Sequence, residues 1–210
     1  MKKYKLYLFD FDGTLFNTMP ALSMVFKNTY KEYGIEITDE ECITFSREPL
    51  PDSYQRKGLD MKYFWDFVKI INYWLNGEES ARLTELYDDT VEFHDYVKKN
   101  NIAVGIVTSN NIPHVKDIYR IKGIDCSNFV VFVGNQEEQT PKPDPAPIKK
   151  ALEMLNYQGD LMDIVYVGDS VNDCIASERA GIDSYLLDRH DEFNHTPYKI
   201  IHSLMDLFKE

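Results

Sequence analysis

Near its N-terminus the chain reads Tyr7-Leu8-Phe9-Asp10-Phe11-Asp12-Gly13-Thr14, an apolar run that ends in two carboxylates, a glycine and a hydroxyl. Such runs are typical of buried parallel strands, and ligands bind beyond the carboxyl ends of these strands in open α/β sheets. The alternation of side chains along a strand puts Asp10 and Asp12 on the same side. Two carboxylates this close repel each other unless a cation, a shared proton or hydrogen bonds offset the charge. The motif therefore predicts a metal site at a strand end.

The composition limits the classes of protein that fit. The 210 residues are 43% hydrophobic, enough for one sizeable core, and the net charge of -12 repels a nucleic-acid backbone. The first apolar run stops at Asp10, too early for a membrane span or a signal peptide. We expect a cytoplasmic monomer or weak homodimer with no nucleic-acid and no membrane partner. The wide spacing of the cysteines disfavours a disulfide framework or a structural zinc site; they are Cys42, Cys126 and Cys174.

Short apolar runs alternate with helical patterns along the chain, which predicts an α/β fold with a Rossmann-like, doubly wound parallel sheet. The expected strands are 5–11, 102–108, 129–133, 164–168 and 184–187. The expected helices are 90–99, 114–122, 145–155 and 172–180. Gly181 suits the C-terminal end of the last helix, because glycine adopts the left-handed conformation found there.

The long segment between 11 and 102 contains no convincing strand and predicts a helical insertion after the first strand. Its expected helices are 20–33, 39–45, 61–76 and 79–87, and prolines and glycines separate them. One of these helices carries apolar side chains along one face, which favours core packing over a ligand cage; they are Phe64, Phe67, Val68, Ile71, Trp74 and Leu75.

Polar residues follow the second expected strand in the same way as the first. The segment Thr108-Ser109-Asn110 offers a hydroxyl and consecutive backbone N–H groups near a helix start, which suits a phosphate or another oxyanion. Farther along, Lys142 stands between two prolines, which fix the backbone around a long cationic side chain. Both features predict contacts with an anion.

The strand expected at 164–168 also runs into acidic residues. Asp169 follows it directly, and Asp173 lies one helical turn later. These carboxylates supply the further oxygen ligands that a hard cation requires. Asp173 also has an alternative role as an acid that stabilises the N-terminus of the following helix.

The four motifs, in this order and spacing, resemble those of the haloacid dehalogenase superfamily of phosphatases, in particular its phosphoglycolate phosphatase and β-phosphoglucomutase branch. The resemblance implies a Rossmann-like catalytic core at 1–16 and 89–210, with an inserted α-helical cap domain at 17–88. It also implies a phosphatase that acts on a small phosphorylated metabolite with Mg²⁺ as cofactor.

Carried over position by position, the resemblance implies that Asp10 is the nucleophile that forms an aspartyl-phosphate and that Asp12 is the general acid and base. The Mg²⁺ ligands would be Asp10, Asp169 and the backbone carbonyl of Asp12, while Asp173 would ligate through water or orient Lys142. Thr108 and Lys142 would be catalytic residues that stabilise the transferring phosphoryl group. The expected substrate- and phosphate-binding residues are Gly13, Thr14, Ser109, Asn110 and Arg47.

Several alternatives stay open at this point. The segment Ser46-Arg47-Glu48 resembles one by which glucose-phosphate mutases hold a second phosphate, whereas Gly168-Asp169-Ser170 favours a phosphatase. Dehalogenase and phosphonatase activities are disfavoured, because neither needs Asp12. A phospho-aspartate switch is disfavoured because Asp10 lies on the first strand. Sugar phosphates, phosphoglycolate, nucleotides and pyrophosphate all remain candidate substrates.

Overall fold

The computed structural model describes residues 2–209, and the chain divides into two compact units. The sheet unit comprises Met1–Asn17 and Leu86–Glu210, and the helical unit comprises Thr18–Glu85. The predicted core bounds include Met1 and Glu210, which lie outside the described residues. The role of the helical unit as a cap stays a prediction.

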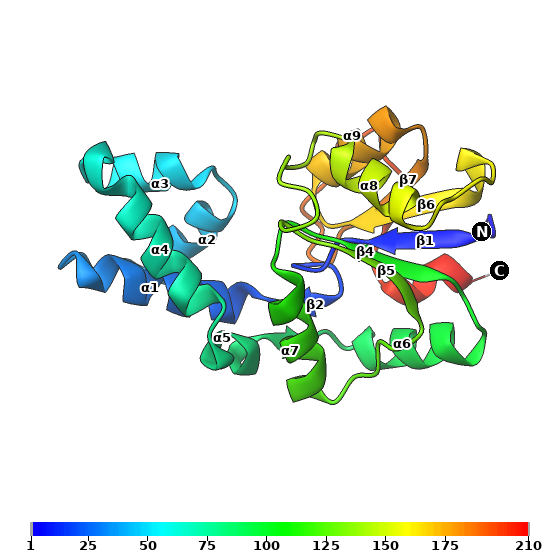
Figure 1. The fold of residues 1–210 in the computed structure, drawn as a ribbon, viewed down its shortest axis with the longest axis horizontal. Helices are drawn as coiled ribbons and strands as arrows, with labels where there is room; N and C mark the ends of the chain where they lie inside the picture. The colour runs from blue at the N-terminus through cyan, green and yellow to red at the C-terminus, as the bar shows by residue number, and fades with distance from the viewer. Residues whose placement is uncertain (1, 210) are drawn as a thin grey trace. The chain divides into compact units, whose positions relative to one another are not determined.

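A parallel sheet with the order β5-β4-β1-β6-β7-β8 forms the centre of the sheet unit (Figure 1). Its central strand β1 pairs with β4 on one side and β6 on the other, so that Phe9 lies opposite Ile106 and Val167. β1 is fully buried, as its unbroken apolar sequence predicts. The strands are β1 (Leu6–Phe9), β4 (Val104–Val107), β5 (Phe129–Val133), β6 (Ile164–Gly168), β7 (Asp183–Leu187) and β8 (Ile200–Ile201).

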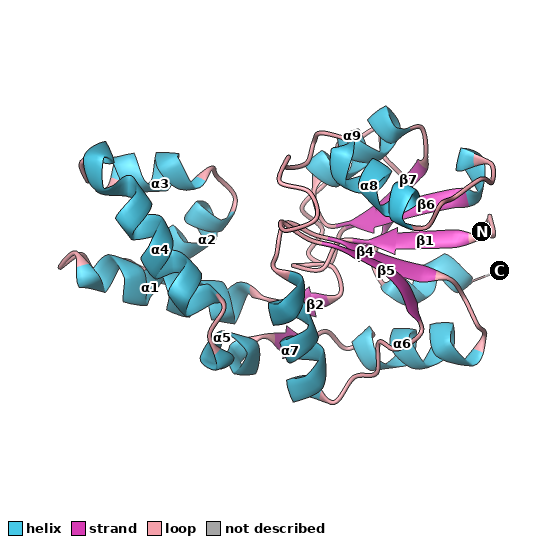
Figure 2. Cartoon of the chain, viewed as in Figure 1, coloured by secondary structure: helices cyan, strands magenta, loops and turns pink. Residues whose placement is uncertain are grey.

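Helices cover both faces of this sheet, as Figure 2 shows: α8 and α9 lie over one face, and α6 and η3 lie over the other. On one face the apolar strand residues form a core with Ile148 and Ala176 of α8 and α9. On the other face Phe9 packs against Phe93 of α6, and Tyr7 packs against Phe208 of η3. The helical segments of this unit are α6 (Thr90–Lys99), α7 (Ile112–Lys122), α8 (Ala146–Met154), η2 (Leu161–Asp163), α9 (Val171–Ala180) and η3 (Leu204–Phe208).

The predicted α/β class and the doubly wound parallel sheet are confirmed. Strands β5 and β6 and helix α6 have the predicted bounds, and the other predicted elements of this unit shift by a few residues. Gly181 ends α9 with φ 79°, the left-handed conformation expected of it. β8 was not predicted, because two isoleucines between polar residues give too short a pattern to identify a strand.

The helical unit has its own apolar core, built mainly by α1 packing against the later helices. The interpretation of the aromatic helix as a packing element is confirmed, because Phe64, Phe67 and Ile71 are buried in this core. Trp65 and Tyr73 on other sides of the same helix are 71% and 72% exposed. The helical segments are α1 (Met19–Glu32), α2 (Asp39–Ser46), α3 (Leu50–Arg56), η1 (Met61–Tyr63), α4 (Phe64–Leu75) and α5 (Glu78–Leu83).

Two expectations about this segment were wrong. Helix α3 was missed because Pro51 was interpreted as a breaker, whereas it stands in the first turn of the helix, where proline is tolerated. The helix predicted at 79–87 ends at Leu83, because Thr84 leaves helical geometry with ψ 136°. The chain then forms the short strand β3 (Glu85–Leu86), which pairs with β2 (Phe16–Asn17). Every helix within residues 2–209 is too short or too polar to cross a lipid bilayer.

Candidate active site

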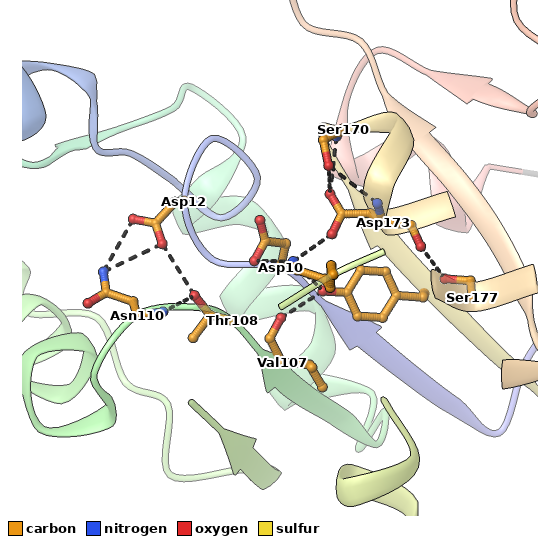
Figure 3. Close-up of polar contacts among 10 residues, drawn as sticks. Asp10, Asp12, Val107, Thr108, Asn110, Ser170, Asp173 and Ser177 are labelled. Atoms are coloured by element: carbon orange, nitrogen blue, oxygen red, sulfur yellow. Dashed lines mark hydrogen bonds and ion pairs between the residues drawn. The ribbon is translucent and has the colours of Figure 1, made fainter. Parts of the chain in front are cut away.

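The carboxyl ends of β1, β4 and β6 lie at one edge of the sheet and carry the predicted polar residues. Asp10 follows β1, and its backbone N–H donates to the carbonyl of Val167 at 2.9 Å. Thr108 follows β4 and donates its backbone N–H to Val133 at 2.9 Å. Neighbouring parallel strands hold these residues in register. The sheet itself therefore brings their side chains together at this edge (Figure 3).

Lys142 is the cation of this edge. Its ammonium lies 2.9 Å from Asp10 Oδ1 and 2.5 Å from Asp173 Oδ1, and its side chain is only 9% exposed. Lysine is a compact charge on a flexible stem, and these two carboxylates restrict where its ammonium lies. The structure thus brings the predicted nucleophile, the predicted lysine and Asp173 into direct contact.

Asp173 has two roles in the structure. Its Oδ1 meets Lys142, as one sequence alternative required. Its Oδ2 accepts hydrogen bonds from the Ser170 backbone N–H at 3.1 Å and from the Ser170 hydroxyl at 2.6 Å, which closes a capping box at the start of α9. The helix-capping alternative is therefore correct as well, and capping fixes the carboxylate that orients the lysine.

Two glycines allow the carboxylates to approach the backbone. A Cβ on Gly13 would lie 2.0 Å from Asp169 Oδ2, and the residue has φ 74°. A Cβ on Gly168 would lie 2.4 Å from the Asp173 carboxyl carbon. Any larger side chain would displace an acid of the site. The prediction that Gly13 binds phosphate remains untested, but its close approach to Asp169 gives glycine a distinct reason to be there.

Asp12 is held by the segment that follows β4. The Thr108 hydroxyl donates to Asp12 Oδ2 at 3.2 Å, and the Asn110 side-chain amide donates to Asp12 Oδ1 at 3.3 Å (Figure 3). The backbone N–H of Asn110 donates to the Thr108 hydroxyl at 3.0 Å, which orients that hydroxyl toward Asp12. These donors were predicted to contact phosphate, and here they bind the predicted acid and base.

The electrostatics of the site are dominated by an excess of acid over base. Burial, and then the neighbouring carboxylates, raise the pKa of Asp10 well above its usual range, although Lys142 opposes the shift. Burial and Asp173 likewise raise the pKa of Asp169 to about 7. Burial lowers the pKa of Lys142, but Asp10 and Asp173 outweigh this effect and the net shift is upward. One lysine thus faces several carboxylates, and another cation would relieve their repulsion.

The donor set fits Mg²⁺. Asp10, Asp169 and Asp173 each offer a carboxylate oxygen, and these oxygens all lie within 4.8 Å of one another. Mg²⁺ prefers oxygen ligands, keeps several waters and is often shared with a phosphate. The excess of negative charge and the close approach of Asp169 to Gly13 are both consistent with a divalent cation at this edge.

Three further residues were predicted to bind substrate or phosphate, namely Ser109, Thr14 and Arg47. Ser109 is exposed beside Thr108, whereas Thr14 is fully buried and its carbonyl accepts a hydrogen bond from Arg189 at 2.8 Å. Arg47 is exposed at the C-terminal cap of α2 in the helical unit. The roles of these three residues in phosphate binding stay predictions.

Sequence reasoning missed two polar residues that contact the predicted ones. Tyr166 contacts Lys142 from within β6, and Arg189 contacts Thr14. Neither follows a motif. Tyr166 was interpreted as one more apolar residue of a buried strand, and Arg189 stands in a segment without periodicity.

Known proteins resemble this chain over most of its length. A curated protein named "Putative pyrophosphatase PpaX" from Caldanaerobacter subterraneus subsp. tengcongensis is 31% identical over 183 residues, which are 87% of this chain and 80% of that protein. A protein named phosphoglycolate phosphatase from Haemophilus influenzae is 27% identical over 190 residues, covering 85% of this chain and 83% of that protein.

The fold and the family agree with these relatives. The crystal structure of a "Putative haloacid dehalogenase-like hydrolase" from Bacteroides fragilis superposes with a TM-score of 0.83 at 25% identity, covering 98% of this chain and 100% of that chain. The family model described as haloacid dehalogenase-like hydrolase matches residues 7–187, from β1 to the end of β7. The matched region contains every predicted motif of the sheet edge, and the protein belongs to the haloacid dehalogenase-like hydrolase family.

Proposed function

We propose that the protein is a Mg²⁺-dependent phosphatase that hydrolyses a small phosphorylated metabolite through an aspartyl-phosphate on Asp10. The observation that carries this proposal is the contact of Lys142 with both Asp10 and Asp173. Asp12, Thr108 and Asp169 lie at the same edge of the sheet. The names of the relatives, pyrophosphatase and phosphoglycolate phosphatase, support a small substrate that carries phosphate.

In the first step an Asp10 carboxylate oxygen attacks phosphorus, and the bond from phosphorus to the leaving oxygen breaks. Lys142 binds Asp10 Oδ1, so it restricts rotation of the carboxylate and keeps the other oxygen available for attack. Asp12 donates a proton to the leaving oxygen, which departs as an alcohol. The hydrogen bonds from Thr108 and Asn110 fix the position of Asp12 for this transfer.

In the second step Asp12 takes a proton from a water molecule, whose oxygen attacks the phosphorus of the aspartyl-phosphate. The bond between phosphorus and the Asp10 oxygen breaks, which releases inorganic phosphate and restores both carboxyl groups to their starting states. Lys142 and the backbone N–H groups after β4 offset negative charge on the phosphoryl oxygens. Bound Mg²⁺, held by Asp10, Asp169 and the carbonyl of Asp12, would supply further charge neutralisation on those oxygens.

We assign the helical unit, Thr18–Glu85, the role of a substrate cap. Its insertion directly after the first motif and the family resemblance support this role. A cap would exclude bulk solvent and large substrates from the reaction. Arg47 in this unit is the proposed contact to a second anionic group of the substrate, and a hexose-phosphate mutase activity is the alternative that this residue leaves open.

The proposal is tested by phosphate release from p-nitrophenyl phosphate with purified protein. We expect release with Mg²⁺ and none after removal of divalent metal by EDTA. Asp10→Asn should lower kcat by at least about 10³-fold, because the nucleophile is lost. Asp117→Asn, a change at a side chain that is 55% exposed on α7, serves as the matched control and should keep full activity.

Two outcomes would contradict the proposal. Phosphate release by Asp10→Asn at the wild-type rate would exclude this nucleophile, and release in EDTA would exclude the metal requirement. A panel of pyrophosphate, phosphoglycolate and sugar phosphates then identifies the substrate by kcat/KM. Conversion of a hexose 1-phosphate to its 6-phosphate, without net phosphate release, would favour the mutase alternative.

A further inference from the structure

The Tyr166 side chain is a polar group in an apolar environment. It lies within β6, is fully buried, and belongs to the same core cluster as Leu8, Val107 and Ile148. A buried hydroxyl costs free energy unless it is hydrogen-bonded. The Tyr166 hydroxyl donates to the carbonyl of Val107 at 2.7 Å and accepts from the ammonium of Lys142 at 3.0 Å. Since a phenol has one hydrogen, these two directions are fixed: the carbonyl takes the proton, and the ammonium donates to the oxygen.

Tyr166 completes the surroundings of Lys142. The Lys142 ammonium donates to the Tyr166 hydroxyl at 3.0 Å and forms ion pairs with Asp10 Oδ1 at 2.9 Å and Asp173 Oδ1 at 2.5 Å. Of these, only Tyr166 is neutral. The ammonium also lies 5.4 Å from the centre of the Tyr166 ring. Tyr166 therefore binds the lysine without competing with phosphate through negative charge.

The second hydrogen bond links Tyr166 to the strand that carries Thr108. Val107 is the last residue of β4, and its carbonyl precedes the Thr108 backbone directly. The Thr108 hydroxyl in turn contacts Asp12. One phenol thus connects the lysine that holds the nucleophile with the segment that holds the proposed acid and base.

We propose that Tyr166 is a positioning residue, which fixes Lys142 and the end of β4 relative to each other for phosphoryl transfer. This inference rests on the proposed function. Phenylalanine would fill the same volume in the core, so packing alone does not require the hydroxyl. Displacement of a catalytic group by about 1 Å can cost roughly 10²-fold in rate. The hydroxyl therefore acts on kcat, while the ring supports the fold.

The test compares Tyr166→Phe with Tyr119→Phe. Tyr119 is also buried, at 2% exposed, and its hydroxyl bonds to His94 at 3.0 Å, so it loses a similar hydrogen bond among other residues. We expect both variants to lower Tm by a similar few degrees. Tyr166→Phe should also lower kcat for p-nitrophenyl phosphate by about 10- to 100-fold with a smaller change in KM. Tyr119→Phe should keep kcat within about 2-fold, because it keeps the ring that packs on Phe11 and loses only a hydroxyl that bonds to His94, a residue outside the site.

A double-mutant cycle identifies the group through which Tyr166 acts. If it acts through Lys142, the kcat loss caused by Tyr166→Phe should largely vanish in a Lys142→Ala background. A full kcat loss in that background, or unchanged kcat in Tyr166→Phe beside a lower Tm, would overturn the inference. If Tyr166→Phe does not fold, 3-fluorotyrosine at position 166 keeps ring and hydroxyl but weakens the acceptor, and kcat should still fall relative to the same replacement at 119.

Hydrogen exchange of the Lys142 ammonium tests this inference separately from the proposed function. In protein with ¹⁵N-labelled lysine, the Lys142 ammonium protons should exchange slowly with water in the wild type and faster in Tyr166→Phe. Unchanged exchange would contradict the inference whatever the activity. Wild-type protein that is inactive on every phosphorylated substrate would instead contradict the proposed function, and the exchange measurement would still decide whether Tyr166 holds the lysine.

Discussion

The sheet unit buries two cations, Lys142 and Arg189, in contrasting surroundings. Their side chains are similarly covered, at 9% and 11% exposed. Lys142 contacts Asp10 and Asp173, and the pKa of nearby Asp169 is raised by burial and by the Asp173 charge. Among the residues that the structure describes, Arg189 instead pairs with a single carboxylate, Asp89, at 3.0 Å. Lys142 thus lies among more carboxylates than its single charge can neutralise, whereas the charge of Arg189 is neutralised by Asp89.

The surroundings of Arg189 are those of a structural tie. Its guanidinium donates to the carbonyl of Thr14 at 2.8 Å and stacks 3.8 Å from the centre of the Tyr87 ring. Its partner Asp89 also accepts from the Ser203 hydroxyl and the Leu204 backbone N–H, both at 2.7 Å. The planar fork of arginine suits several fixed acceptors at once. Balanced charge therefore characterises a part of the unit that stabilises the fold, whereas unbalanced charge characterises the candidate active site, where we propose that a cation binds.

The largest effect on stability is expected where the matched pair is broken. Arg189→Ala leaves the Asp89 charge buried without its cation and should lower the free energy of unfolding by about 3 to 5 kcal/mol. Urea unfolding followed by circular dichroism measures this loss. Arg189→Lys retains the charge but not the fork, so it should lose less. If Arg189→Ala were as stable as the wild type, Arg189 would not be a structural tie, and the contrast with Lys142 would fail.

A smaller effect of opposite sign is expected at the site with excess acid. Asp169→Asn keeps the shape of the side chain beside Gly13 and removes one of the repelling charges. In EDTA at pH 8 it should raise the free energy of unfolding by about 1 to 2 kcal/mol, since a buried charge with like neighbours is costly. Phosphatase activity should be lost at the same time. Thermal unfolding in EDTA, with Asp117→Asn as control, measures the change.

Addition of Mg²⁺ sharpens the same comparison. A ligand that binds only the folded protein raises its stability, so Mg²⁺ should raise the Tm of the wild type. The Tm of Asp169→Asn should rise much less, because one ligand is lost. The tie around Arg189 predicts no such dependence, and Arg189→Ala should respond to Mg²⁺ as the wild type does. An Asp169→Asn variant that is less stable than the wild type in EDTA would show that its charge is matched after all.

The two kinds of surroundings also differ in how well the sequence predicts them. Asp10, Thr108 and Asp169 each follow a buried strand, and parallel strand ends share an edge, so their convergence could be predicted from the motifs. The contacts of Tyr166 and Arg189 depend on which residues far away in the chain pack beside them. Tyr166 looks like any other aromatic residue of a strand. Local patterns cannot reveal a partner 59 residues away, such as Val107.

Local sequence patterns also limited how much of the fold could be predicted. Long periodic helices and apolar strands were predicted within a few residues, because their patterns reflect burial that repeats along the element. The two-residue strands β2, β3 and β8 are too short to show a period, and they form only because another strand lies beside them. The proline in the first turn of α3 has two interpretations, helix start or helix breaker, which sequence alone does not separate.

His94 gives the smallest expected effect and a third case, a buried titratable group kept neutral. Its Nδ1 donates to the Thr90 carbonyl at 2.7 Å, so its Nε2 accepts from the Tyr119 hydroxyl at 3.0 Å, and its ring stacks on Phe129. Burial lowers its pKa, although the bond to Thr90 opposes the shift. As pH falls below about 6.5, His94 is protonated in the unfolded chain while it stays neutral in the folded protein. The free energy of unfolding therefore declines.

The slope from this one group is at most about 1.4 kcal/mol per pH unit, and it should be visible between pH 6.5 and 5. His94→Phe keeps an aromatic ring in the cluster and cannot titrate, so its stability should depend less on pH over this range. Because the acids of the site with excess charge titrate equally in both proteins, the difference between their free energies of unfolding isolates His94. Parallel pH profiles for the two proteins would mean that His94 has the same pKa in the folded and the unfolded chain. His94 would then not be a buried group kept neutral, and its contrast with Lys142 and Arg189 would fail.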